Sequence, residues 1–296
     1  MTRIVALAID IILVVCSVLS VNVNGDNVKK YKAYENVSYG TNERHTLDLY
    51  LPQTKKSELG LIVFIHGGSW HHGSKDSFRK RCKKFAKKGY ATATVNYRLV
   101  VQGATANDMI DDISLAMGKI KKIAAGKKIN IKKVMTVGLS AGGHLSLLFA
   151  YKKVDTSPIK PVAAVAYAPP SDLYSSEMYI SSRLGTSKKM AERISILCGK
   201  KHTYKTKEKA KNELMSISPY YNVTKKAVPT LIAHGIKDTA VVYAQSDRLI
   251  KKLKKYGIPC NLVTFPNSAH HLDNDPDKRA LFNQYIEEYA FIYLKK

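Results

Sequence analysis

Short apolar runs alternate with longer amphipathic segments along most of the chain. Such runs are typical of strands that are buried on both faces of a sheet. They predict strands within residues 60–68, 90–99, 133–140, 162–170, 230–235 and 261–266. Apolar residues three or four positions apart indicate helices. This spacing occurs within 76–89, 107–125, 141–151, 242–257 and 278–294. Strands that alternate with helices form βαβ units, so we predict an α/β fold with a mostly parallel central sheet and helices on both faces.

Two segments depart from this alternation. Residues 36–40 and 45–52 alternate apolar and polar positions, which predicts an antiparallel strand pair at one edge of the sheet. Residues 171–226 contain no strongly apolar strand and many lysines. We expect them to form a cap-like insertion over the carboxyl edge of the sheet, where α/β proteins bind their ligands. No linker divides the chain, so 26–296 is expected to be one domain.

The first 25 residues have the pattern of a secretory signal peptide. A short basic start leads into an apolar stretch and then into polar residues that end at Gly25. Asp10 interrupts the apolar stretch, and the uninterrupted part, Ile11–Leu19, is too short to span a bilayer. We predict cleavage after Gly25 and a secreted chain with no stable membrane span. Anchoring by an uncleaved N-terminus is the alternative.

The charge of the chain is strongly positive. Lysine and arginine number 48 against 23 acidic residues, a formal net charge of +25. The lysines are scattered in pairs and form no basic stripe with interleaved aromatic residues, so no specific nucleic-acid partner is expected. A solvated surface biased toward lysine is the favoured interpretation, with weak polyanion binding as the alternative.

A secreted chain would be open to two covalent modifications. Cys82, Cys198 and Cys260 allow one disulfide, and the sequence leaves all three pairings open. Asn36 and Asn222 each begin an Asn-X-Ser/Thr sequon and are candidate glycosylation sites.

The segment Gly138-Leu139-Ser140-Ala141-Gly142 stands between a predicted strand and a predicted helix. A G-x-S-x-G sequence in this position predicts a sharp turn that lifts the serine hydroxyl above the end of the sheet. Glycines are required there because side chains at these positions would collide. Ser140 is therefore the candidate nucleophile, against the simpler interpretation of a tight turn alone.

A serine nucleophile needs a base, and the base needs a carboxylate to orient it. Asp238 follows the predicted strand at 230–235, and the neighbours His270 and His271 follow the one at 261–266. Acid and histidine thus come after Ser140 in the chain order that α/β hydrolases use. The alternatives are a helix N-cap for Asp238 and a surface-loop role for both histidines.

Donors for a developing oxyanion are the remaining requirement. Gly67 and Gly68 follow the predicted strand at 60–68 side by side, so their bare backbone amides can approach a carbonyl oxygen. The amide of Ala141, the residue after the nucleophile, would complete the oxyanion hole.

No metal or other cofactor is expected. His66, His71 and His72 lie close together, but no acidic or thiol partner stands at metal-ligand spacing from them. We expect His66 to pack or to fix a turn, and His144 to lie against the sheet.

Five motifs occur in a fixed order: "HGGSW", "VNYRL", "GLSAGGHL", "HGIKDTAVV" and "FPNSAHH". In this order they resemble the α/β-hydrolase serine esterases, in particular the acetyl- and feruloyl-esterase-like, carboxylesterase-type branch, and the resemblance covers 46–296. It implies Ser140 as nucleophile and Asp238 as acid. It also implies His270 as base, because "FPNSAHHL" falls in step with the family's "YPNAGHGF". The chain departs from the family at Ser69, where many relatives have a third glycine.

The function that follows is a secreted serine hydrolase that cleaves esters of small or medium acyl groups through an acyl-enzyme. The substrate would be a small-molecule or glycan ester, and Trp70 and the 171–226 insertion would shape its pocket. An amidase, formamidase or peptidase on the same fold is one alternative. A non-catalytic binding protein on a hydrolase scaffold is another.

Overall fold

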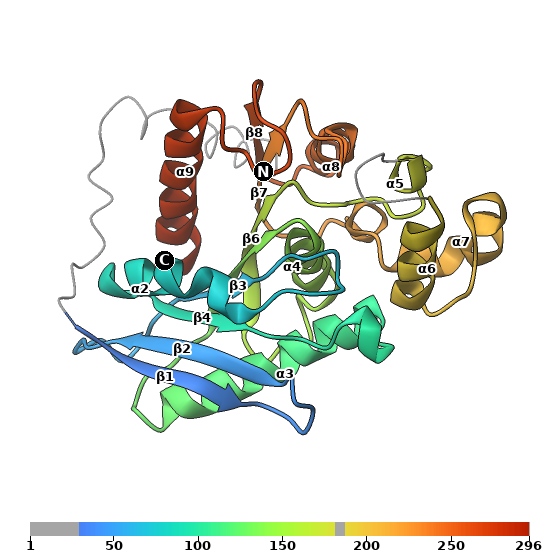
Figure 1. Ribbon diagram of the computed structural model, residues 1–296. Helices are drawn as coiled ribbons and strands as arrows, with labels where there is room; N and C mark the ends of the chain where they lie inside the picture. The colour runs from blue at the N-terminus through green and yellow to red at the C-terminus, as the bar shows by residue number, and fades with distance from the viewer. Residues whose placement is uncertain (1–29, 181–186, 296) are drawn as a thin grey trace.

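The computed structural model describes residues 30–180 and 187–295, which are built around one eight-stranded sheet (Figure 1). The strands are β1 (Tyr31–Ser38), β2 (Thr46–Pro52), β3 (Leu61–Ile65), β4 (Ala91–Val95), β5 (Lys133–Leu139), β6 (Lys160–Tyr167), β7 (Thr230–Gly235) and β8 (Cys260–Phe265). Their order in the sheet is β1-β2-β4-β3-β5-β6-β7-β8. β2 is antiparallel to β1 and to β4, and all other neighbouring pairs are parallel. The predicted mostly parallel sheet with an antiparallel edge is confirmed.

The central strands are apolar throughout because both of their faces are covered. All residues of β3 and β4 are buried. Side chains alternate between the faces of a strand, so Ile62 and Phe64 of β3 lie in one core and Leu61, Val63 and Ile65 in another. A strand with two buried faces shows no polar alternation in its sequence.

Helices form a layer on each face of the sheet (Figure 1). The long helices are α2 (Arg79–Lys87), α3 (Ala106–Ala125), α4 (Ala141–Lys152), α8 (Ala244–Lys255) and α9 (Pro276–Leu294). α2 and α9 share a core with one face, and α3, α4 and α8 pack on the other. Two 3-10 turns, η1 (Lys75–Phe78) and η2 (Val100–Gln102), precede α2 and α3.

The described part of the segment expected to be an insertion, 171–226, consists of short helices joined by turns and irregular backbone, and it contains no strand. It contains α5 (Glu177–Ile180), α6 (Ser187–Cys198), η3 (Tyr204–Ala210), α7 (Lys211–Ser216) and η4 (Pro219–Asn222). η4 packs against α4 and α8, and α6 contacts η2. In Figure 1, α6 and α7 lie to the right of the sheet.

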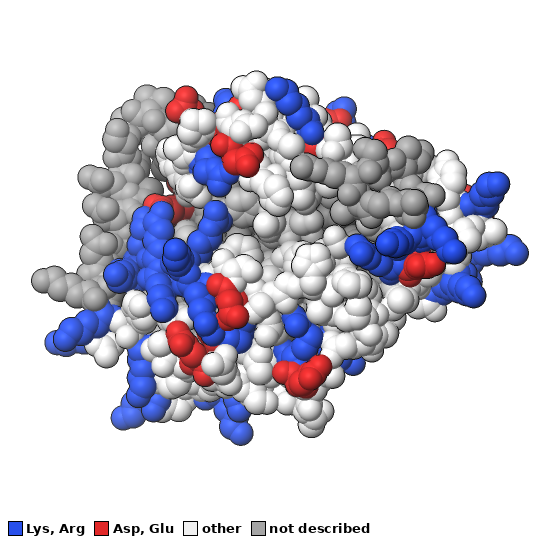
Figure 2. Space-filling model, viewed as in Figure 1, with Lys and Arg blue, Asp and Glu red and all other residues white. Residues whose placement is uncertain are grey.

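The basic residues are unevenly spread over the face shown in Figure 2. Lysine and arginine side chains gather over α2 and around α6 and α7. The α2 sequence, RKRCKKFAK, turns its few apolar residues into the core, while its basic residues are exposed or half-buried.

Several features expected from the sequence concern the ends and the cysteines. The predicted signal peptide, 1–25, lies outside the described residues. Within the described part of the chain, no helix is long and apolar enough to cross a membrane. Cys82, Cys198 and Cys260 each carry a thiol, so none of the three pairings left open by the sequence is present.

Candidate active site

Ser140 stands at the sharp turn between β5 and α4. Its backbone has φ 54° and ψ −120°, a strained conformation for a residue with a side chain. The flanking glycines are required by close approach. A Cβ on Gly138 would lie 2.0 Å from the carbonyl oxygen of Gly142, and a Cβ on Gly142 would lie 2.1 Å from that of Ile65. Glycine at positions 138 and 142 allows this close backbone packing, which places the hydroxyl of Ser140 at the carboxyl end of the sheet.

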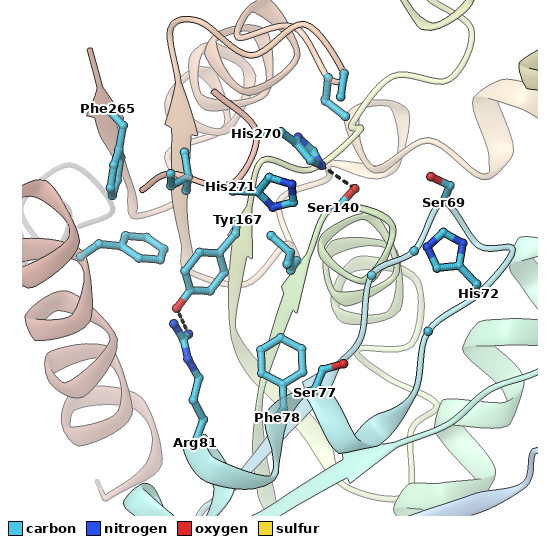
Figure 3. A pocket seen from close by; sticks show the side chains of 18 of the residues that line it. Ser69, His72, Ser77, Phe78, Arg81, Ser140, Tyr167, Phe265, His270 and His271 are labelled. Carbon is cyan, nitrogen blue, oxygen red and sulfur yellow. Dashed lines mark hydrogen bonds between the residues drawn. The ribbon is translucent and has the colours of Figure 1, made fainter. Parts of the chain in front are cut away.

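Three side chains that are distant in sequence meet at this turn (Figure 3). Nε2 of His270 lies 2.9 Å from Oγ of Ser140, and Nδ1 of His270 lies 2.7 Å from Oδ2 of Asp238. A carboxylate only accepts hydrogen bonds, so the imidazole proton is on Nδ1 and Nε2 is left to accept the proton of the hydroxyl. Of the two neighbouring histidines, His270 occupies this place, whereas His271 is exposed and lines the cavity beside it.

Asp238 is buried and fully engaged. Its Oδ1 accepts hydrogen bonds from the amides of Ala240 at 2.8 Å and Val241 at 2.9 Å. Burial by itself would raise the pKa of Asp238, but hydrogen bonds from His234, His270 and the Val241 amide outweigh it and lower the pKa. The carboxylate is therefore charged at neutral pH. It is not the N-cap of α8, a position held by Tyr243.

His234 is a site residue that the sequence did not single out. It lies at the end of β7 with no exposed surface, and its Nε2 is 3.3 Å from Oδ2 of Asp238. The same nitrogen lies 2.7 Å from the carbonyl oxygen of Val241, while Nδ1 lies 2.6 Å from the hydroxyl of Ser246. A carbonyl oxygen only accepts, so the proton is on Nε2. His234 thus connects β7 to both Asp238 and Val241 in the loop that follows this strand. Its only sequence signal was a polar residue inside the apolar run "TLIAHG".

The predicted oxyanion residues surround the serine. Gly67 and Gly68 line the same cavity as Ser140, and their amides have no acceptor among the described residues. A Cβ on Gly67 would lie 2.6 Å from the carbonyl oxygen of Leu139, so the loop backbone passes directly over the turn. Ala141 is the first residue of α4, where the amide has no acceptor within the helix.

A buried network holds this loop in place. Nδ1 of His66 lies 2.8 Å from the carbonyl oxygen of Gly67, and the ring stacks on Tyr97 with centroids 4.3 Å apart. The guanidinium of Arg44 contacts Nε2 of His66 at 3.2 Å and donates to the carbonyl of Gly73 at 3.0 Å. Burial lowers the pKa of His66 to about 4, so the ring is neutral and donates from Nδ1 while it accepts from Arg44. His66 therefore fixes the turn, as its position suggested.

Trp70 does not line the pocket, contrary to expectation. It is 2 % exposed and packs in the core beneath the loop. Its indole nitrogen donates to Nδ1 of His144 at 3.1 Å, and Nε2 of His144 donates to the carbonyl of Ile217 at 2.7 Å. The physical reason is the backbone of the loop: Ser69 and Trp70 both have positive φ, which turns the indole inward.

The cavity in front of Ser140 has a volume of about 560 Å³. Its walls are largely apolar, and these side chains come from Phe78, Leu139, Phe265, Leu272 and Phe282. No described residue of 171–226 lines it, so the described part of the expected cap does not form the pocket. The cavity thus has room for a small or medium molecule, with the hydroxyl of Ser140 at one wall.

The three histidines near the loop do not form a metal site. Within 30–180 and 187–295, no group of three or more His, Cys, Asp or Glu side chains is arranged to hold an ion. His66 is bonded to the loop at Gly67. The rings of His71 and His72 pack edge to face, with their centroids 6.2 Å apart.

Comparisons with known proteins bear on this site. The family model BD-FAE matches residues 47–253. The probable isoprenylcysteine alpha-carbonyl methylesterase ICME of Oryza sativa subsp. japonica is 27% identical over 248 residues, which cover 79% of this chain and 57% of that protein. Kynurenine formamidase of Danio rerio is 26% identical over 241 residues, 79% of this chain and 73% of that protein. The crystal structure of Esterase B from Lactobacillus Rhamnosis has a TM-score of 0.70 at 17% identity and covers 97% of this chain and 94% of its own.

The fold and the arrangement at Ser140 define an α/β hydrolase of the serine-esterase class. The family model covers more than half of the chain, and the chain belongs to the BD-FAE family. The resemblance found in the sequence motifs is thereby confirmed. The chain spans a little over half the length of the rice relative, and the likeness to Esterase B is one of fold.

Proposed function

We propose that the protein hydrolyses carboxylic esters of small or medium acyl groups with Ser140, His270 and Asp238 as its catalytic residues. The observation that carries the proposal is the continuous hydrogen-bond chain from Oγ of Ser140 through His270 to a charged, buried Asp238. Such a chain lets the hydroxyl lose its proton as it attacks a carbonyl carbon.

The reaction would proceed in two halves. Oγ of Ser140 attacks the ester carbonyl while Nε2 of His270 takes the proton, and the carbonyl oxygen becomes an oxyanion held by the amides of Gly67, Gly68 and Ala141. His270 then returns the proton to the departing alcohol, which leaves an acyl-enzyme. Water, deprotonated by His270, attacks the acyl carbon, and Ser140 recovers its proton as the acid leaves.

Loss of the nucleophile is the direct test. Ser140→Ala is expected to lower kcat by roughly 10⁴–10⁶ on short para-nitrophenyl esters and to abolish labelling by a fluorophosphonate probe. Ser146→Ala is the matched control, because Ser146 lies on α4, the helix that follows Ser140, donates to the carbonyl of Val165 at 3.3 Å and does not line the cavity. Equal labelling of wild type and Ser140→Ala would contradict the assignment, and no labelling of either folded protein would favour a non-catalytic binding role.

Amide hydrolysis is the second candidate, because a relative that spans most of this chain is called a kynurenine formamidase. Ester and N-formyl amide substrates with the same leaving skeleton separate the two. For an ester hydrolase, the ratio of kcat/KM for the ester to kcat/KM for the formamide is expected to exceed the ratio of their rates of spontaneous hydrolysis.

We further propose that the protein is secreted after cleavage behind Gly25, on the grounds of the signal-like pattern in the sequence. Expression in eukaryotic cells followed by N-terminal sequencing of the protein in the medium tests this. Retention of full-length protein in the membrane fraction would favour the anchored alternative.

A further inference from the structure

The cavity in front of Ser140 has a cationic end that ester hydrolysis alone does not require. Arg81 of α2 and Arg279 of α9 both line it, together with Tyr167 at the end of β6. In Figure 3 the phenol of Tyr167 points away from Ser140 toward the guanidinium of Arg81. Three segments far apart in sequence therefore place two cations and a hydroxyl in one cavity.

Tyr167 is held so that its hydroxyl proton remains available. Nη1 of Arg81 donates to the phenol oxygen, and the guanidinium lies over the ring at 5.0 Å from its centroid. The ring packs edge to face on Phe282 with centroids 4.7 Å apart. Burial raises the pKa of Tyr167 although Arg81 and Arg279 oppose it, so the phenol is protonated at neutral pH. An oxygen that accepts from Arg81 can still donate its own proton to a ligand.

The two arginines lack an acidic partner among the described residues. Arg279 donates through Nη2 to the carbonyls of His271, at 3.2 Å, and Leu272, and Arg81 donates to the phenol of Tyr167. Other cations of the same region do have carboxylates: Arg79 pairs with Asp48. Arg81 is half-buried and Arg279 is exposed. A half-buried guanidinium that pairs with no acid, such as that of Arg81, is a ready binding group for an anion.

The surroundings define what that anion is attached to. Phe78, Phe265 and Phe282 form walls of the same cavity as Ser140 and the arginines. An apolar wall favours an apolar body, and a planar guanidinium with a neighbouring hydroxyl matches the geometry of a carboxylate. The basic surface over α2 in Figure 2 would draw such an anion toward this side of the molecule.

We propose that Arg81, Tyr167 and Arg279 form an anion subsite, and that the enzyme prefers esters that carry a carboxylate at the end remote from the scissile bond. The inference rests on the proposed ester hydrolysis at Ser140 and specifies its substrate class. Arg81 and Tyr167 bind the carboxylate directly. Arg279 adds a second cation and, through the carbonyls of His271 and Leu272, joins the subsite to the loop that carries the catalytic histidine.

Two matched pairs of esters test the proposal from either side of the ester bond. The mono-para-nitrophenyl ester of adipic acid is compared with para-nitrophenyl hexanoate, and para-acetoxybenzoate is compared with para-acetoxybenzamide. We expect the anionic member of at least one pair to have the higher kcat/KM after correction for spontaneous hydrolysis. Arg81→Gln is expected to lower kcat/KM for that anionic ester at least about tenfold, the scale of one charge-assisted hydrogen bond, and to change the neutral ester less than about twofold.

Lys80→Gln is the matched control. Lys80 is exposed, lies next to Arg81 on the same helix and does not line the cavity. The Lys80→Gln substitution therefore removes one positive charge, as Arg81→Gln does, but leaves the subsite unchanged. Tyr167→Phe is expected to lower turnover of the anionic ester alone, by a smaller factor than Arg81→Gln. Arg81→Lys keeps the charge without the planar fork, and provides a second reading should Arg81→Gln fold poorly in an unfolding titration.

Equal kcat/KM within both pairs of esters would overturn the proposal, as would a preference for the anion that survives in Arg81→Gln and Arg81→Lys. An equal loss in Arg81→Gln and Lys80→Gln would assign the preference to overall charge and would also overturn it. Failure of the proposed function looks different. In that case the neutral esters are not turned over by the wild type, or are turned over equally by Ser140→Ala.

Discussion

At the scale of single residues, the direction of each hydrogen bond settles the protonation of the site. His270 donates from Nδ1 to Asp238 and accepts at Nε2 from Ser140. Nε2 of His234 donates to the carbonyl of Val241 and lies 3.3 Å from Oδ2, the oxygen of Asp238 that His270 also contacts. Asp238 is thus held by two imidazoles and two backbone amides. A carboxylate held in this way can orient the imidazole of His270 without becoming protonated itself.

Replacement of this carboxylate tests its role. Asp238→Asn presents an amide that donates to Nδ1 of His270 and forces the proton onto Nε2, where it blocks transfer from Ser140. We expect kcat to fall roughly 10⁴-fold at neutral pH with the fold retained, as measured by ester hydrolysis and circular dichroism. Loss of less than about tenfold would mean that Asp238 does not set the tautomer.

The lowered pKa of Asp238 also makes the free energy of unfolding depend on pH. The unfolded chain protonates this group near pH 3.9 as pH falls, whereas the folded chain does so only at lower pH. Asp238 therefore contributes stability above about pH 3.9, and this contribution is lost as pH falls through the lowered pKa of the folded state. In urea titrations, the gap in unfolding free energy between wild type and Asp238→Asn should be constant from about pH 5 to 8 and should narrow below about pH 4.

At the scale of elements, the junction of β5 and α4 shows how packing dictates glycine. A side chain at Gly142 would meet the backbone of Ile65, the last residue of β3, and of His66 after it, and backbone cannot rotate aside as a side chain can. Gly118, within α3, has nothing closer than 3.9 Å to the place of a Cβ. Gly142 has no space for a Cβ, whereas Gly118 has enough space for one.

Alanine at these two positions should act in opposite directions. Gly142→Ala is expected to lower the free energy of unfolding by more than 3 kcal/mol, roughly the upper end of single-site effects, and to abolish activity because the turn is displaced. Gly118→Ala should raise stability by about 0.5–1 kcal/mol, the cost of glycine within a helix. Chemical denaturation measures both, and a Gly142→Ala variant as stable as Gly118→Ala would contradict the close approach of α4 to β3.

At the scale of the whole molecule, the excess of basic residues is the dominant electrostatic feature. A formal charge of +25 on 296 residues repels itself in the compact state. The acidic side chains are partly committed to specific pairs, such as Asp48 with Lys75 at 2.8 Å. The repulsion therefore acts mainly between exposed lysines. Salt screens it, with a Debye length of about 10 Å at 0.1 M.

Salt is expected to stabilise the protein as a consequence. The midpoint of thermal unfolding should rise by a few degrees when sodium chloride increases from about 10 mM to about 200 mM, because the Debye length shrinks from about 30 Å to below 10 Å. Calorimetry measures the shift. Replacement of the exposed Lys55, Lys127 and Lys254 by glutamine should reduce the gain. A midpoint that falls with salt would show that attractive ion pairs dominate instead.

The order of strands and helices, the antiparallel edge, the sharp turn at Ser140 and the loops after β7 and β8 that carry Asp238 and His270 could all be predicted from the amino-acid pattern. These features follow from local periodicity and from turns whose residues are neighbours in the chain. The motif resemblance already favoured His270 over His271, whereas the support of Asp238 by His234 and the burial of Trp70 follow only from how distant segments pack together. The same packing brings Arg81 to Tyr167 across 86 positions of sequence. A basic residue on a lysine-rich helix looks like solvated surface in the sequence, because its role depends on which distant segment packs against it.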